Sequence, residues 1–571
     1  MTPMVMKIAY LKTRLLLPVL VAVASPASTA HAAAPGITGG TGGTATFNLT
    51  AQPAYLNQPD GSLAYSWGYG CDPSHPPTGF APAAITTTFC NPMQVPGPTL
   101  IVTEGQTVTV NLLNQLPAPA GNTSILFPGF QVTASATPGQ TGACATASQG
   151  VLTTEAASGC SVTYTFTASS PGTRSYSSGT QGDLQIEMGL YGAIIVLPAH
   201  VPSACSTGLP LTNPGGNAKA QGTWGEHDFR LAAAAYNNPN TCYDREYLFQ
   251  FAEMDANIHS QALAQVTAMG NCTAGAAGCN LNVPTEPYHP SYFLINGRSM
   301  PDDMDVNYGV EYPHQPYNGN PHLHPGEEVL LRIIGQGRWL HPFHEQANHV
   351  RILARDANLI LTPDGNVLAG APLFTTTTTP GQAMDGMFYF TGRGLNWDMY
   401  GHTPNPFGGD PLAELPCTPD ANGYNTSATG AVNYFEWCQD HNKPLEAAPF
   451  GDVNGGGPAT LPNPLILTHG NWYSGSPYLG PDATLRATTI LRTTANGIGG
   501  ANGSAGCSTT SGANCSNLLP LNTQANPAKE RGWAFMWHSH NERETTTNNV
   551  FPGGMMMMLV DSREFVIDES N

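Results

Sequence analysis

The chain has 571 residues, of which 10% are charged and 41% are apolar, with 20 Lys and Arg against 39 Asp and Glu. An apolar fraction of this size excludes a wholly disordered chain, and the length favours two to four domains. The net charge of −19 argues against a nucleic-acid-binding protein, which needs a basic face, and against binding to an anionic membrane surface.

Residues 1–34 have the three parts of a signal peptide. Lys7, Lys12 and Arg14 precede an apolar run, Leu15 to Ala24, and small residues follow through Ala30-His31-Ala32, an A-x-A cleavage pattern. The run is about half as long as a membrane-spanning helix needs to be, and no later stretch approaches that length. We therefore expect a protein without a membrane span that is exported to the periplasm, the cell surface or the medium.

The rest of the sequence is dominated by short strand patterns between Gly and Pro turns. β-branched or alternating runs predict strands over residues 99–103, 106–112, 161–167, 192–197, 327–334, 350–354 and 555–560, and residues 260–269 are the best candidate for a short helix. Many short strands separated by turns are typical of sandwiches or barrels. The predicted fold class is all-β.

Segments rich in Pro, Gly and Ser indicate where domains end. Pro198 to Gly216 closes a first unit and Thr403 to Pro416 closes a second, while the third contains a Gly/Asn/Ser-rich loop, Asn496 to Asn517. After the signal peptide, the predicted domains are residues 35–200, 201–410 and 411–571.

All 12 cysteines follow residue 34 and none forms a C-x-x-C. An even number of cysteines in an exported protein favours disulfides. Pairing between sequence neighbours is the simplest hypothesis, although other connectivities stay open. It gives Cys71–Cys90, Cys144–Cys160, Cys205–Cys242, Cys272–Cys279, Cys417–Cys438 and Cys507–Cys515.

Several motifs resemble the multicopper oxidases. They are Val95-Pro96-Gly97-Pro98 with Glu104-Gly105-Gln106, Pro171-Gly172-Thr173 with Gly189 to Val196, Tyr292 to Arg298 with Pro325 to Arg332, Thr375 to Asp385, and Phe535 to His540 with Gly553 to Met556. The resemblance implies consecutive cupredoxin-like Greek-key β-sandwich domains, stapled here by disulfides. It also implies copper binding and an oxidoreductase activity.

The resemblance further implies where copper ligands should lie. The family oxidases have a blue copper, held by two imidazoles, a thiolate and a weak axial ligand, and a three-copper cluster held by four His-x-His blocks. The two blocks of the first domain fall on Leu126 with Pro128 and on Ser177 with Gly179, and no histidine lies between His75 and His200. The first domain therefore supplies no imidazole from these blocks.

The last block is only partly retained. It has His538-Ser539-His540, with Glu544 at the position of a third histidine. Ser539 replaces the thiolate, and a hydroxyl is not a soft ligand. Without the thiolate, Met555 to Met558 are interpreted as core residues, since Met fills gaps well. Residues 541–544 either orient the histidines or form an internal salt bridge through Arg543.

The richest block is His341-Pro342-Phe343-His344, with Gln346 at a third histidine position and His349 close behind. We predict His341, His344, His349, His538 and His540 as the candidate metal ligands. Such imidazoles suit one Cu(II), Zn(II) or Ni(II) ion. The alternative is that they hydrogen-bond the backbone and fill a former site.

Two functions remain open. One is an exported multicopper-oxidase-like protein with degenerate type 1 and trinuclear sites, which binds at most a single copper and lacks laccase-type activity. The other is a non-catalytic extracellular structural, assembly or partner-binding protein on the same scaffold, acting as a homo-oligomer or with another extracellular protein. No catalytic residue is predicted for either.

Overall fold

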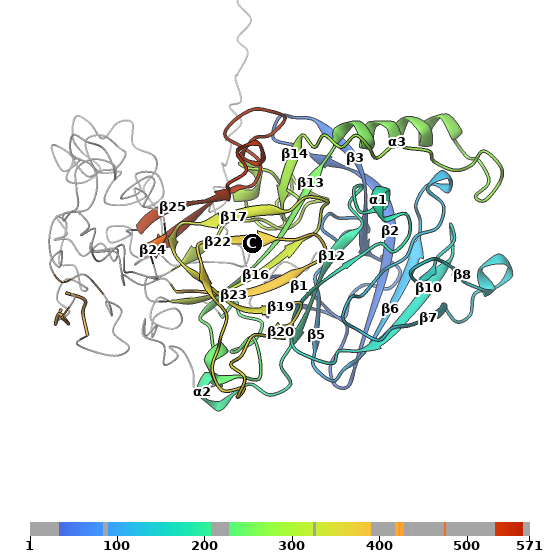
Figure 1. Ribbon diagram of the computed structural model, residues 1–571. Coiled ribbons are helices and arrows are strands. Elements are labelled where there is room, and N and C mark those ends of the chain that lie inside the picture. The colour runs from blue at the N-terminus through green and yellow to red at the C-terminus, as the bar shows by residue number, and fades with distance from the viewer. Residues whose placement is uncertain are drawn as a thin grey trace, which may run out of the picture.

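The computed structural model describes residues 34–83, 90–206, 228–323, 327–389 and 532–562, with short pieces between 417 and 474. Four β-sheets of five or more strands make up most of this part of the chain, and the helices there are few (Figure 1). The predicted all-β fold class is confirmed.

Two five-stranded sheets form a first sandwich, with the strand orders β11-β12-β5-β1-β4 and β3-β2-β6-β10-β7. Their bounds are β1 (Gly36–Thr38), β2 (Thr44–Asn57), β3 (Leu63–Cys71), β4 (Gly79–Ala81), β5 (Leu100–Thr103), β6 (Thr107–Asn114), β7 (Thr133–Ala136), β10 (Ser161–Thr167), β11 (Gly172–Ser177) and β12 (Tyr191–Leu197). Alternate residues of each strand share a face, so Val108 and Val110 of β6 pack with Leu100 of β5 and Ile194 of β12 in one core.

A second sandwich has the strand orders β14-β13-β16-β23-β19-β20, with β21 against β19, and β15-β26-β25-β17-β22. Their bounds are β13 (Arg245–Met254), β14 (Tyr292–Ile295), β15 (His322–Leu323), β16 (Glu328–Gly335), β17 (His341–Glu345), β19 (Val350–Arg355), β20 (Asn358–Leu359), β21 (Pro372–Leu373), β22 (Thr375–Thr378), β23 (Ala383–Tyr389), β25 (Gly532–Ser539) and β26 (Met556–Ser562). Phe249, Val329, Phe343 and Trp537 lie in its core.

The last two strands have partners far away in sequence. β25 and β26 belong to the predicted third domain, yet β25 pairs with β17 and β26 pairs with β15 of the predicted second domain. Most of residues 411–531 lies outside the described residues. The domain boundaries therefore stay a prediction.

The predicted strands are confirmed with small shifts at their ends, and so is the predicted helix. This helix, α3 (Ala256–Met269), begins four residues earlier than expected because the Asp255 side chain accepts a hydrogen bond from the Asn257 backbone and caps it. The other short elements are α1 (Gly182–Gln185), α2 (Ser203–Ser206), β8 (Ser148–Gln149) with β9 (Thr154–Glu155), and β18 (Ala347–Asn348) with β24 (Tyr473–Ser474). Among the described helices, none has the length and apolar character needed to cross a membrane.

A buried polar contact joins the two sandwiches. Thr173 of β11 donates to Asp385 Oδ1 of β23 at 2.6 Å, and Arg332 Nη1 of β16 donates to Thr173 Oγ1 at 3.0 Å. Arg332 Nε also donates to Glu246 Oε2 at 2.7 Å. All four side chains are buried. These contacts give each charge a partner that offsets the cost of its desolvation.

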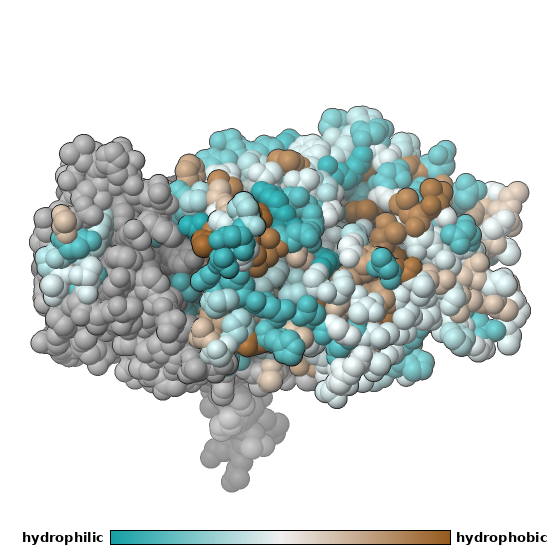
Figure 2. All heavy atoms as spheres, turned by 60° about the horizontal axis from the view of Figure 1, so that its bottom comes forward, coloured by the Kyte–Doolittle hydropathy of each residue, from teal (hydrophilic) through white to brown (hydrophobic). Residues whose placement is uncertain are grey.

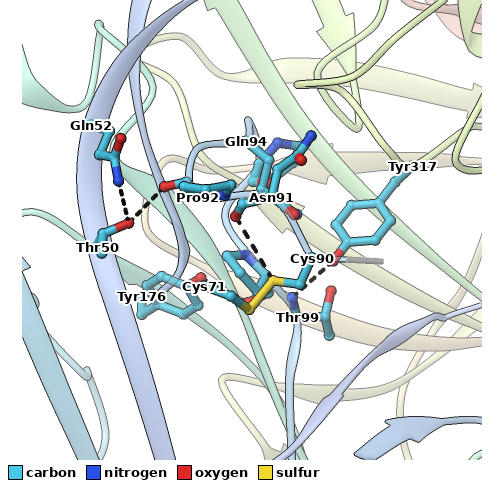
Figure 3. The surroundings of a disulfide bond; sticks show 12 residues. Thr50, Gln52, Cys71, Cys90, Asn91, Pro92, Gln94, Thr99, Tyr176 and Tyr317 are labelled. Atoms are coloured by element: carbon cyan, nitrogen blue, oxygen red, sulfur yellow. Dashed lines mark hydrogen bonds between the residues drawn. A yellow bond between two sulfur atoms is a disulfide. The ribbon is translucent and has the colours of Figure 1, made fainter. Parts of the chain in front are cut away.

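Five of the six predicted disulfides are present, which confirms these pairings. The sixth, Cys507–Cys515, lies outside the described residues. Figure 3 shows the Cys71–Cys90 bond close to Tyr176 and Tyr317. Next to it, Thr50 donates to the Pro92 carbonyl at 2.7 Å. This hydrogen bond holds the segment that follows Cys90 against β2.

Replacing both Cys71 and Cys90 with Ser is expected to lower the free energy of unfolding by about 3 kcal/mol, because the disulfide restricts a loop in the unfolded chain. Denaturant titration of the oxidised proteins measures this loss. The matched control is the Cys272/Cys279 double variant, whose shorter loop, with a sequence separation of 7 against 19, predicts a loss of about 2 kcal/mol. A larger loss in the control would contradict the loop-length argument.

Candidate metal centre

The pairing of β17 with β25 brings together the two blocks that carry the predicted ligands. His344 lies opposite His538 and Phe343 lies opposite Ser539 in an antiparallel register, and the His540 N–H donates to the Pro342 carbonyl at 2.8 Å. Because successive side chains of a strand point to opposite faces, His344, His538 and His540 lie on the outer face of this sheet. Phe343 and Trp537 face the core.

The three outer-face imidazoles are neighbours. The ring centroids are 4.7 Å apart for His344 and His540, 4.7 Å for His538 and His540, and 5.7 Å for His344 and His538. Their exposure increases in the order His344, which is buried, then His538, then His540, which is exposed. The site therefore opens to solvent at His540.

Two of these imidazoles are held through their Nδ1 atoms. His538 Nδ1 lies 2.9 Å from the Ser539 carbonyl and therefore donates to it, and His344 Nδ1 lies 2.9 Å from Thr375 Oγ1. A hydrogen bond at one ring nitrogen fixes the ring and leaves the other nitrogen for a ligand. Such contacts favour coordination through Nε2.

Both of these imidazoles are kept neutral. Burial, followed by repulsion from His540 and His538, lowers the pKa of His344 to about 4. Burial also lowers the pKa of His538. Neutral imidazole is the form that ligates a metal ion, so this pair suits a metal near neutral pH.

His349 lies beside this cluster, next to Phe374. The Phe374 ring makes edge contacts with both His349, at 5.2 Å between centroids, and His344, at 5.7 Å. Phe374 is 50% exposed. The Phe374 ring therefore packs against both imidazoles.

His341 lies apart, on the inner face of the same strand. Its Nε2 is 3.0 Å from Glu253 Oε2 and its Nδ1 is 3.0 Å from Glu544 Oε2. Ser539 donates to the same Glu544 oxygen at 2.6 Å, and Asn541 Nδ2 donates to Oε1 at 2.7 Å. Both nitrogens of His341 are thus engaged by carboxylates.

This arrangement makes His341 a buried cation. Burial lowers its pKa, but hydrogen bonds and charge attraction from Glu253 and Glu544 outweigh that effect and raise the pKa to about 9. Glu253 also accepts from the backbone N–H of Trp339 at 2.8 Å, and the Tyr288 hydroxyl oxygen lies 3.3 Å from its Oε1. Every charge in the network has hydrogen-bonding partners.

Of the two interpretations of residues 541–544, orientation of a histidine is the one observed. Glu544 orients His341, whereas Arg543 donates to Asn549 Oδ1 at 3.2 Å and to the Pro290 carbonyl at 2.9 Å. The Arg543 salt bridge is not formed within the described residues.

The sequence did not indicate Glu253, which lies on β13. Glu253 is a carboxylate inside a strand in which every residue is buried. Because a buried charge needs a partner, this was the signal that could have indicated its role.

The corresponding positions of the first sandwich are packed without imidazoles. Leu126 and Ser177 form an antiparallel bridge, with the Leu126 N–H donating to the Ser177 carbonyl at 2.7 Å. A Cβ atom at Gly179 would lie 2.8 Å from Leu126 Cγ. Leu126 therefore fills the space that a side chain at position 179 would need.

The methionine run divides between the two faces of β26 and the turn before it. Met555 and Met557 pack in the core with Trp537, as the core interpretation expects. Met556 is also buried, but its register position is opposite His538. It lies on the outer face.

Within the described ranges, no group of three or more His, Cys, Asp or Glu side chains has the arrangement that would hold a metal ion. The imidazole rings of His344, His538 and His540 are adjacent, but they do not have the arrangement of a formed metal site. Because His540 is exposed, its side chain has room to turn towards the other two.

Comparison with known proteins gives one family match: residues 82–200 match the multicopper oxidase model. This stretch contains the Val95-Pro96-Gly97-Pro98 and Pro171-Gly172-Thr173 motifs. The resemblance of residues 82–200 to that family is therefore confirmed. No curated protein matches the sequence.

Several solved structures are similar to the chain. A blue copper oxidase from Nitrosomonas europaea is 12% identical with a TM-score of 0.39, covering 90% of this chain and 85% of that one. A copper nitrite reductase from the same organism is 20% identical with a TM-score of 0.33, covering 60% and 84%. A laccase from Botrytis aclada is 19% identical with a TM-score of 0.34, covering 62% and 47%. The resemblance to the multicopper oxidases depends on the match over residues 82–200.

Replacing His341 with Gln is expected to lower the free energy of unfolding by about 3–5 kcal/mol at pH 6.5, because Glu253 and Glu544 lose the buried cation between them. Denaturant titration measures the loss. His349→Gln is the matched control, since its ring packs beside Phe374. A similar loss in both variants would contradict the role of His341 between Glu253 and Glu544.

The His341 contribution is also expected to depend on pH. A pKa of about 9 lies above the unfolded value of about 6.5, so the stabilisation is complete below pH 6.5 and is lost as pH rises through 9. Titrations at pH 6.5 and pH 10 should show the difference between the wild type and His341→Gln shrinking at high pH. A constant difference would show that His341 is not the titrating group.

Proposed function

We propose that the chain is an exported, multicopper-oxidase-like protein that binds one copper ion and lacks the electron-transfer route of a laccase. The observation that carries the proposal is the separation of the remaining histidines into two faces of one sheet. One face has three adjacent imidazoles, and the other has a hydrogen-bonded charge network.

The type 1 position is degenerate in this proposal. A blue copper needs a thiolate and two imidazoles, and Ser539 and Glu544 stand where the resemblance expects the thiolate and one imidazole. Both are hydrogen-bonded to each other, and Glu544 is paired with His341. In this proposal the opposite charges of His341, Glu253 and Glu544 offset one another without a metal ion.

The trinuclear position is degenerate as well. A three-copper cluster needs imidazoles from two domains in the family, and the first sandwich offers Leu126, Ser177 and Gly179 instead. The close packing of Leu126 against Gly179 supports this assignment.

The copper site that we propose consists of His344, His538 and His540. Three imidazoles are a suitable donor set for copper, and the hydrogen bonds at Nδ1 of His344 and His538 orient those rings. His341 is omitted because both of its nitrogens contact carboxylates. In this proposal His349, whose ring packs on Phe374, is a neighbour of the site and not a ligand. When bound, copper supplies a redox-active cation at a solvent-accessible position.

Export agrees with the cysteine chemistry. Residues 1–33 lie outside the described residues, so the signal peptide remains a proposal. Five disulfides and no free cysteine among the described residues are typical of proteins in oxidising compartments.

The protein purified from a copper-containing medium is expected to hold one copper per chain. Mass spectrometry of metals together with EPR measures this. His344→Ala/His538→Ala is expected to abolish binding, because it removes both oriented imidazoles, while the control His75→Ala should retain it, since His75 is a surface residue paired with Asp72. Copper retained by the double variant would place the ion elsewhere.

The copper-loaded protein is expected to lack the intense absorption of a thiolate–copper bond and to show no laccase-type turnover. The reason is that Ser539 cannot supply the sulfur of a blue site. Visible absorption and an assay with a phenolic reductant test this. An intense blue band would overturn the degenerate assignment.

A non-catalytic scaffold is the second candidate function. Exposed apolar side chains support it, among them Val151 at 97% and Val310 at 87% exposure. Figure 2 shows several apolar patches among hydrophilic residues on one face of the molecule. Absence of metal in the purified protein would favour this function.

A further inference from the structure

A row of three side chains crosses the outer face of the sheet that holds the imidazole cluster. His344 of β17 lies opposite His538 of β25, and His538 lies opposite Met556 of β26. Directly opposite residues of antiparallel strands have Cβ atoms about 4.5–5.5 Å apart. The thioether of Met556 is therefore within reach of the imidazole of His538.

Met556 differs from the methionines on either side of it. Met555 and Met557 pack in the apolar core with Trp537 and Phe343, and Met556 is not part of that core. Its side chain is nevertheless only 3% exposed. It is a buried thioether beside an imidazole that is oriented by the Ser539 carbonyl.

A second methionine lies on the same face. Met536 precedes His538 by two residues on β25, so the two side chains share a face, and Met536 is partly buried. In the register of the sheet its partner is Met558. Met536 and Met556 thus place two sulfur-bearing side chains on the face that carries the imidazole cluster.

Donor chemistry distinguishes this row from a purely imidazole site. Thioether sulfur is a soft ligand that selects Cu(I), whereas imidazole accepts Cu, Zn, Fe and Ni alike. Two neutral imidazoles and a thioether add no negative charge, which suits a monovalent ion better than a divalent one. The donors also include only two histidines, so the site needs no third imidazole to form.

We propose that Met556 is a ligand and that His344, His538 and Met556 form a binding site for Cu(I), with His540 at its open side. This proposal rests on the copper site proposed above and specifies the oxidation state that it prefers. Met556 gives the site a preference for Cu(I) over Zn(II), which three imidazoles alone would not give.

The test is a competition for Cu(I) between the full-length protein and a coloured Cu(I) chelator under anaerobic reducing conditions. Met556→Leu is expected to weaken Cu(I) binding by roughly tenfold or more, since it removes the soft donor, and to leave Zn(II) binding unchanged. Met557→Leu is the matched control, because Met557 is the adjacent core methionine. It should bind Cu(I) like the wild type.

The outcomes separate this proposal from the proposed function. Equal Cu(I) affinity in Met556→Leu and Met557→Leu would overturn the Met556 ligand and leave the imidazole copper site standing. Failure of the wild type to bind copper in either oxidation state would overturn both. If Met556→Leu does not fold, X-ray absorption of the wild-type Cu(I) protein decides, since sulfur scattering is required and nitrogen-only scattering contradicts the proposal.

Discussion

The pairing of β17 with β25 is the constraint on which the candidate site depends. It joins residues 341–345 to residues 537–539 in one antiparallel register. Because the side-chain period of a strand is two, a shift by one residue would exchange the two faces. The register therefore decides that His344 and His538 meet on the outer face while Ser539 lies on the inner face with Glu544 and His341.

The inner face of the sheet holds a buried charge network around Ser539, where the resemblance predicts a copper ligand. Ser539 donates to Glu544, and the positive charge beside them is that of the protonated His341 ring, which lies between Glu253 and Glu544. The network continues through Tyr288, which donates to Glu187 Oε2 at 2.7 Å. Glu187 in turn accepts from the Asp255 backbone at the start of α3. The buried charges thus connect the second sandwich to the first.

Much of the fold could be predicted from local signals. The alternating residues Ser161 to Thr167 form β10, as predicted, and the five described disulfides join cysteines that are neighbours in the sequence. Both features depend on residues that are close together in the chain. The candidate site was harder. His538 and His540 were marked by their motif, but Glu253 lies in a strand without any motif, and its role appears only where β13 packs beneath β17.

The sequence by itself determined which ligands exist: no imidazole at Leu126, Ser177 or Gly179, no sulfur at Ser539, and five histidines in two blocks. Residue identity settles that, because a side chain without an imidazole or a sulfur atom cannot supply one in any fold. Only the tertiary structure decided how the five divide. His341 became a buried cation and His344 a neutral neighbour of His538, since burial and the charges brought close by folding set the protonation state of each ring.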